Sequence, residues 1–130
     1  MPISYEVDKQ RRLVVCTASG VVTAGDVLGF HERIVKDTDF NSSFSQLVDC
    51  TAITKTNISP KGMRALAEKS SFSTDSRRAF VAASPLGFGL SRVYQIVRSL
   101  RGDKHIRVFR NRADALTWLL AEKDENDATA

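Results

Sequence analysis

Residues 104–120 contain a strand followed at once by a helix. Ile106 and Val108 lie two residues apart, which is the spacing of a half-buried strand. Asn111 then stands at a helix N-cap position, with Asp114 three residues later as a variant of the capping box. The apolar residues that follow keep helical spacing: Ala115, Leu116, Leu119 and Leu120. This unit predicts a fold in which strands and helices alternate.

The rest of the chain repeats the alternation. Strands are predicted at 4–8, 13–18, 46–49 and 78–83, and helices over 23–36, from 59, and from 85 to Gly102, with Gly20 ending the second strand. The order β-β-α-β-α-β-α-β-α predicts a single-domain α/β protein with a mostly parallel five-stranded sheet and one antiparallel strand from the N-terminal hairpin. The domain is expected to cover residues 1–121, and residues 122–130 to form a polar, flexible tail.

Apolar spacing also predicts which sides of the elements are buried. In the first helix these positions are Val27, Phe30, Ile34 and Val35, and in the third they are Leu86, Leu90, Val93, Val97 and Leu100. The strands at 13–18 and 79–83 are apolar on both faces, so both faces should be covered. Either one helix folds round to the second face or a partner chain covers it, which would make a homodimer.

Composition places the chain among soluble globular proteins of the cytoplasm. It has 130 residues, 42% of them hydrophobic and 26% charged, with a formal net charge of +4. Its apolar runs are shorter than the roughly 20 residues of a membrane span, and its N-terminus lacks the pattern of a signal peptide. Cys16 and Cys50 are expected to be free, buried thiols rather than a disulfide.

The sequence contains no pattern that indicates an enzyme. His31 and His105 lack metal-ligand spacing and are interpreted as surface residues. Nucleophile-elbow, Walker and dinucleotide-binding motifs are missing, and Gly87-Phe-Gly89 gives only part of the last of these. We therefore predict no catalytic residues, no metal and no cofactor.

The carboxyl ends of the strands are where a parallel sheet would bind a ligand or partner. The candidates predicted there are Asp49, Thr51, Ser84, Pro85, Gly87 and Phe88. Asp49 has the chemistry to hold a ligand hydroxyl or a partner's cation, although satisfying the amides of its own loop is the commoner role. Pro85 and Gly87 are expected mainly to shape their loop.

Two further features have a functional and a structural interpretation. Ser59 is a helix N-cap whose phosphorylation would be stabilised by the helix terminus, or it is simply a cap. A basic stretch lies near the C-terminus: Arg98, Arg101, Lys104, Arg107, Arg110 and Arg112. Because Asp103 and Asp114 interrupt it, we favour a solvated sheet edge over a nucleic-acid surface.

Several motifs together resemble the SpoIIAA-like superfamily, which includes STAS and Sec14-like domains. They are Leu-Val-Asp at 47–49, Ala-Phe-Val-Ala-Ala-Ser-Pro at 79–85, Gly-Leu-Ser-Arg-Val-Tyr-Gln at 89–95, and Val-Phe-Arg-Asn-Arg-Ala-Asp-Ala-Leu-Thr-Trp-Leu at 108–119. With the N-terminal hairpin they span nearly the whole chain. The chain is most similar to a branch of the superfamily whose function is not assigned.

The resemblance implies one antiparallel and four parallel strands, and a non-enzymatic role in binding proteins or small ligands. The best known members are anti-anti-sigma factors, which are switched by phosphorylation of a serine in an Asp-Ser-Ser-Gly loop at the second helix. Here residues 57–62 are Asn-Ile-Ser-Pro-Lys-Gly, so Ser59 and Gly62 match while the aspartate and the second serine are absent.

The first functional hypothesis is a regulatory or protein-interaction module of the STAS type, with an unidentified protein partner. The alternative is a domain that binds a small molecule or lipid in an apolar pocket between helix and sheet near residues 84–88. Neither hypothesis involves nucleic acid or a membrane span.

Overall fold

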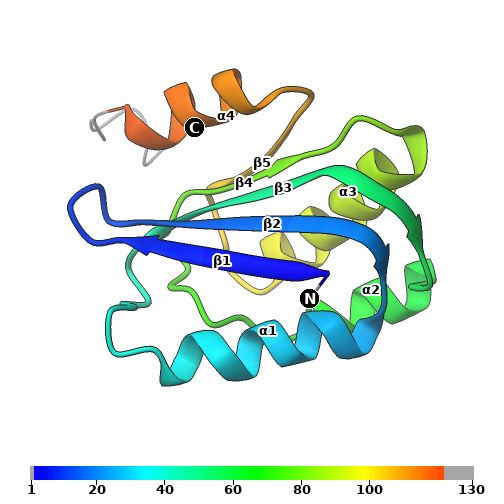
Figure 1. Cartoon of the computed structure of the whole chain (residues 1–130), viewed down its shortest axis with the longest axis horizontal. Helices are drawn as coiled ribbons and strands as arrows, with labels where there is room; N and C mark the ends of the chain where they lie inside the picture. Colours follow the sequence, from blue (N-terminus) through cyan, green and yellow to red (C-terminus); the bar gives the residue numbers. More distant parts are fainter. Residues whose placement is uncertain (1, 122–130) are drawn as a thin grey trace.

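The computed structural model describes residues 2–121, which form a mixed five-stranded sheet with four helices (Figure 1). Its strands are β1 (Ile3–Asp8), β2 (Leu13–Val22), β3 (Ser45–Thr56), β4 (Arg78–Val81) and β5 (Ile106–Phe109). They lie in the order β1-β2-β3-β4-β5, with β1 antiparallel to β2 and the other neighbours parallel. This confirms the predicted α/β class, element order and sheet; the predicted tail, 122–130, lies outside the described residues.

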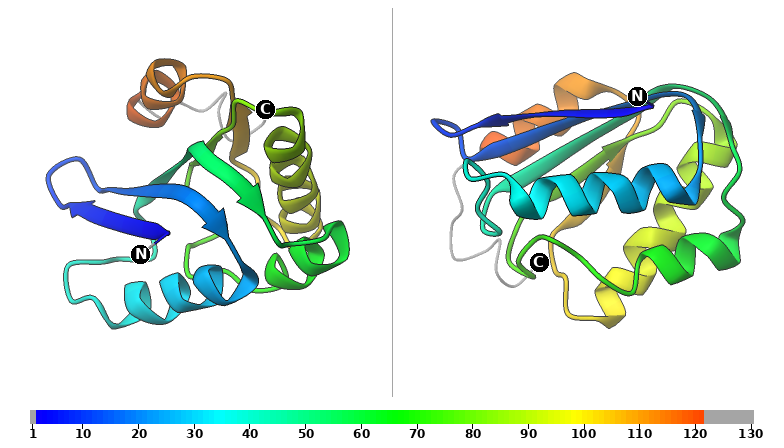
Figure 2. Two further views of the ribbon diagram at one scale, coloured as in Figure 1. Left: turned by 45° about the vertical axis from the view of Figure 1, so that its right-hand side comes forward. Right: turned by 60° about the horizontal axis from the view of Figure 1, so that its bottom comes forward.

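The helices divide unequally between the two faces of the sheet. α1 (Ala24–Lys36), α2 (Pro60–Leu66) and α3 (Pro85–Leu100) lie on one face, and α4 (Arg112–Leu120) lies on the other (Figures 1 and 2). Strand order progresses in one direction and parallel crossovers are right-handed, so the three crossover helices must share a face. α4 follows the last strand and is free to fold back over the opposite face.

Each helix begins where the sequence predicts, and a side chain caps its first turn. Thr23 and Asp26 form a reciprocal capping box on α1. Ser59 and Ser84 accept hydrogen bonds from the amides of Gly62 and Gly87 at 3.0 Å, each with proline next in the chain. On α4, Asn111 caps the amide of Asp114 at 2.9 Å.

The core has a layer on each face of the sheet. On the face of the crossover helices, Val14 and Cys16 of β2 pack with Phe30 and Ile34 of α1. On the other face α4 contributes Ala115 and Leu119, which join the buried sheet residues Leu13, Leu47, Ala79 and Val81. A helix of the same chain therefore covers the second apolar face, which is the first of the two explanations that the sequence left open. The homodimer stays a prediction.

Two strands are longer than predicted. β2 continues through Gly20 to Val22, and β3 runs to Thr56 instead of ending at Asp49. Gly20 adopts a φ of +68°, and the pairing of β2 with β3 shifts register on either side of it. Such bulges let the pair bend without breaking, which is why a glycine that indicated a strand end lies inside the strand. β4 ends two residues earlier than predicted, at Val81.

The predicted buried sides of α1 and α3 are partly wrong. Val35 is 61% exposed, and on α3 Leu86 and Leu100 are 61% and 82% exposed. Leu90 is buried as predicted, but the other buried residues of α3 are Ser91, Tyr94 and Arg98. The prediction that the basic stretch is solvated is wrong for Arg98, which is buried and pairs with buried Asp103. The other five cations of that stretch are exposed. The buried side of α3 thus includes two polar residues, Ser91 and Arg98, which apolar spacing alone does not indicate.

Candidate functional site

The residues predicted at the carboxyl ends of the strands do not form one site. Asp49 and Thr51 belong to the face that α4 covers, where Asp49 accepts hydrogen bonds from the amide and hydroxyl of Thr51 at 3.0 and 2.7 Å. Its other carboxylate oxygen pairs with Arg112 of α4 at 3.2 Å. Asp49 thus bonds within β3 and anchors the start of α4; because β3 continues to Thr56, Asp49 lies inside the strand and not in the loop that the sequence predicted.

These contacts make the stability of the fold depend on pH. Burial raises the pKa of Asp49, but the bonds from Thr51 and the charge of Arg112 outweigh it and hold that pKa below the ordinary 3.8. The resulting stability is present above about pH 4 and is lost as the pH falls through the folded-state pKa. We expect Asp49→Asn to reduce the free energy of unfolding by up to about 1 kcal/mol at pH 7. In urea titrations the difference should shrink toward pH 3; a pH-independent difference would contradict this assignment.

The second group of predicted residues surrounds the start of α3. Ser84 and Pro85 supply its cap and first residue, and both are exposed. Phe88 lies half-buried under the guanidinium of Arg110, which is 4.6 Å from its ring centroid. Gly87 faces inward and lines an apolar cavity, described below. A role of these residues in binding stays a prediction.

Ser59 caps α2, which has seven residues and buries none of them fully. The serine is exposed, on the loop between β3 and α2. An added β-carbon at Gly62 would stand 3.3 Å from the Ser59 hydroxyl, so glycine suits this tight first turn. Phosphorylation of Ser59 stays a prediction.

An open groove of about 740 Å³ separates α1 from α2. Its floor and walls are mostly apolar, with Leu28 and Val35 from α1 facing Ala65 and Leu66 of α2. Leu28 is 53% and Val35 is 61% exposed, so two large apolar side chains on this helix are left without cover. Charged side chains stand at its edges: Glu32, Glu68 and Lys69.

His31 lies in the same groove and is not the surface residue that the sequence predicts. It is half-buried, and its Nδ1 is 3.0 Å from the hydroxyl of Ser71. Burial, and then the positive charge of Arg78, lower the pKa of His31, so the ring is neutral at pH 7. A neutral, hydrogen-bonded imidazole adds a polar contact point to an otherwise apolar wall.

A second concavity of about 120 Å³ lies in the core, between the sheet and the three crossover helices. Its lining contains no charged residue and draws on β1, β2, β3, β4 and all three of those helices. Val22, Leu90 and Tyr94, three of its walls, are each exposed by 6% or less. Within the described part of the chain, Thr56 Oγ1 is a buried oxygen with no hydrogen-bond partner, and Thr56 also lines this cavity.

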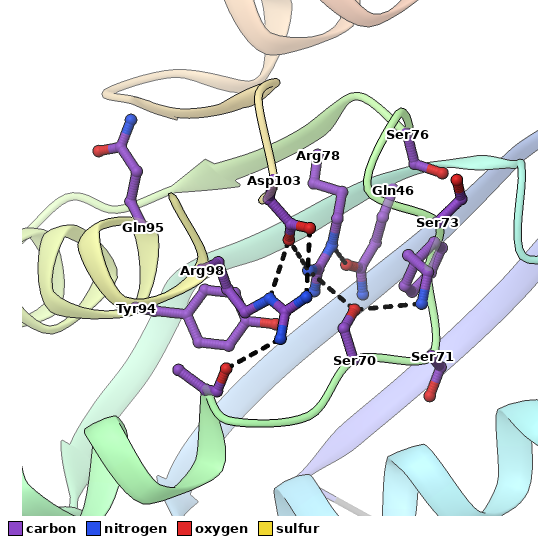
Figure 3. A network of polar contacts seen from close by, with 12 residues as sticks. Gln46, Ser70, Ser71, Ser73, Ser76, Arg78, Tyr94, Gln95, Arg98 and Asp103 are labelled. Carbon is purple, nitrogen blue, oxygen red and sulfur yellow. Dashed lines mark hydrogen bonds and ion pairs between the residues drawn. The ribbon is translucent and has the colours of Figure 1, made fainter. Parts of the chain in front are cut away.

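A buried network of charges lies where strands β3, β4 and β5 begin (Figure 3). Asp103 accepts two hydrogen bonds from Arg98, at 2.9 and 3.2 Å, and forms an ion pair with Arg78 at 3.6 Å. Arg78 also donates to Gln46 at 2.9 Å and to the hydroxyl of Tyr94 at 2.7 Å. Every charge here has a partner, and all three ionic side chains are at most 7% exposed. The network is closed to ligands and ties α3 to the sheet.

Neither cysteine has the environment of a nucleophile. Both thiols are free, as predicted, and burial raises the pKa of Cys16 and of Cys50 to about 12. Among residues 2–121, no group of three or more histidine, cysteine or acidic side chains is arranged to hold a metal ion. No described helix is long and apolar enough to cross a membrane.

Sequence reasoning missed the groove, the cavity and the buried network. The network left a partial signal, since Arg78 stands at the start of a strand whose other three residues are apolar. The cavity left none, because an apolar residue that lines a void has the same spacing as one that fills it. The groove requires α2 to be placed against α1, which no local pattern specifies.

No protein-family model and no curated protein matches the sequence. Solved structures do match the fold. An uncharacterized DUF3478-family protein of Shewanella loihica PV-4 with a SpoIIAA-like fold has a TM-score of 0.58 at 17% identity, over 90% of this chain and 93% of the other. An anti-sigma factor antagonist from Mycobacterium paratuberculosis has a TM-score of 0.54 at 19% identity, over the same shares. The chain therefore has the SpoIIAA-like fold that its motifs resemble.

Proposed function

We propose that this protein is a regulatory module of the STAS type that binds a protein partner through the groove between α1 and α2. The observation that carries the proposal is the exposed apolar pair Leu28 and Val35 at the wall of that groove. Exposed apolar patches bordered by polar residues are typical of protein interaction sites. The fold it shares with a protein described as an anti-sigma factor antagonist supports the same class of role.

The chemistry of the groove favours a partner that presents an apolar ridge. Leu28 and Val35 lie seven residues apart, so they stand two turns apart on one side of α1. Glu32 lies between them, and Lys69 and Glu68 border the α2 side. A helix of a partner protein with an apolar stripe would bury both side chains and leave its flanking charges to pair with this rim.

The proposal predicts that a double variant, Leu28→Asp with Val35→Asp, loses its partner. In affinity capture from cells that naturally contain the protein, we expect recovery of the partner to fall about tenfold or more, because both contacts lie in the proposed interface. Leu120→Asp is the matched control, since Leu120 is a 46% exposed leucine on α4 across the sheet. A partner retained by the double variant would contradict the groove, and reproducible lack of any partner would contradict the module.

A second function, the binding of a small molecule, is favoured by the apolar cavity lined by Gly87. Protein interiors are close-packed, so a void of this size among core side chains is a candidate binding site. This function is independent of the groove, and a regulatory module could use it to sense a ligand.

A further inference from the structure

A polar pocket of about 190 Å³ lies at the edge of the sheet, where β5 begins. Its described lining comes from α3, α4, the first half of β5 and the residues just before β4 and β5. We propose that this pocket binds the phosphate group of a small phosphate monoester, with Lys104 and Arg107 in contact with the anion. The pocket is separate from the groove and from the core cavity, so the proposal rests on neither function proposed above.

The described lining of the pocket is positively charged. Four of its residues have basic side chains and none is acidic: Arg77, Lys104, His105 and Arg107. Lys104 and Arg107 are exposed, and within residues 2–121 neither forms an ion pair with a carboxylate. A concave site lined by charges of one sign attracts and concentrates ions of the opposite sign. The lining therefore favours an anion.

Two guanidinium groups of the pocket are held in place by the end of α4. Arg77 is 2% exposed, and its Nη1 donates to the carbonyls of Trp118 and Ala121 at 2.8 and 2.9 Å. Because so little of Arg77 is exposed, it contributes its positive charge and not a ligand contact. The guanidinium of Arg107 lies 5.0 Å from the centroid of the Trp118 ring. This cation–π contact keeps Arg107 beside the pocket and lowers the entropy lost when it binds an anion.

Size and charge favour a phosphate group over other anions. Drug-sized ligands occupy roughly 300–1,000 Å³, so this pocket takes a phosphate and leaves the rest of its carrier molecule in solvent. Arginine binds phosphate through two parallel hydrogen bonds, and lysine binds it as a point charge. A phosphate monoester carries a charge of about −1.5 to −2 at pH 7. It therefore gains more from several cations than a carboxylate, which carries a single charge.

The sequence also offers a competing source of negative charge. Four acidic residues follow Ala121 within six positions: Glu122, Asp124, Glu125 and Asp127. Ala121 itself bonds to Arg77, so these acids are joined to the chain next to the pocket. A carboxylate tethered at this point has a high effective concentration and would compete with a free phosphate. The test therefore includes a full-length variant in which all four acids are replaced by their amides.

The test is a titration of the full chain with methyl phosphate at constant ionic strength. Trp118 is the only tryptophan of the chain, so its fluorescence reports on this pocket. We expect a saturable change in that fluorescence, and NMR shifts of Arg107 and of the Trp118 indole, with a dissociation constant on the order of 1 mM. Dimethyl phosphate, a diester with one negative charge, should bind at least about tenfold more weakly, because it gains less from the cations.

A double variant, Lys104→Gln with Arg107→Gln, should weaken methyl phosphate binding about tenfold or more, because both charged contacts are lost. Its matched control is Lys55→Gln with Arg64→Gln, which removes the same charge from exposed positions on β3 and α2 and should stay within about twofold. Equal weakening in the two double variants overturns the assignment to this pocket. Binding by neither the wild type nor the amide variant overturns the phosphate site. Binding by the amide variant alone assigns the pocket to the chain's own acids and overturns the small-molecule ligand.

Discussion

Asp103→Ala is expected to lower the free energy of unfolding by about 3–5 kcal/mol. Asp103 is 5% exposed and neutralises Arg98 and Arg78, which are themselves 6% and 2% exposed. Removing the carboxylate leaves two guanidinium groups in the core without a counter-charge, and loss of one partner is the costly way to break a buried ion pair. Urea unfolding of the variant, followed by circular dichroism, measures the effect.

The matched control for this variant is Asp39→Ala. Asp39 also pairs with a cation, Lys9 at 3.5 Å, but both side chains are more than half exposed. Solvent screens that pair, so we expect a change of at most about 1 kcal/mol. If the two variants lost similar amounts of unfolding free energy, the charges of the buried network would be stabilised by solvent and not by one another.

Leu47→Ala is expected to lower the free energy of unfolding by about 2–5 kcal/mol. Leu47 is fully buried in the layer between the sheet and α4, together with Ala79, Ala115 and Leu119. Truncation removes its transfer free energy and leaves a void that the small residues around it are too short to fill. The same denaturation assay measures the loss.

Leu120→Ala serves as the comparison on the same layer. Leu120 belongs to α4 but is 46% exposed, so its truncation removes little buried area and should change stability by less than about 1 kcal/mol. A small effect of Leu47→Ala would mean that α4 does not seal this face of the sheet. The homodimer would then be the better explanation for strands that are apolar on both faces.

Local signals in the sequence were sufficient for the framework of the fold. The caps Thr23, Ser59 and Asn111 placed three helix starts and Pro85 the fourth, because a capping side chain bonds to an amide only two or three residues away and proline suits the first helical position. Strand alternation and the one-directional order then followed from periodicity and the handedness of crossovers. The resemblance to SpoIIAA-like domains agreed with both, and the structural matches confirm it as a fold.

Candidate sites were predicted less well, and the residues show why. Asp49 was expected in a loop after a short strand, but it lies inside β3, and its bond to Arg112 joins positions far apart in the chain. Gly87 was named for its place at a strand end, and its contribution to a cavity depends on residues from six other elements and the loop after β3. His31 and Arg98 were expected at the surface because a polar residue on a helix gives no local sign of a buried partner.

The sequence by itself determined the order, the type and the starting points of the elements, since these depend on contacts within a few residues. Only the tertiary structure decided which side of α3 is buried, that α4 covers the second face, and where packing leaves the groove and the cavity. Those outcomes depend on long-range pairs such as Arg98 with the carbonyl of Ala67, and Arg78 with Tyr94 and Gln46. The functional proposals rest on these long-range features, because partners and ligands bind to surfaces and voids that separate elements build together.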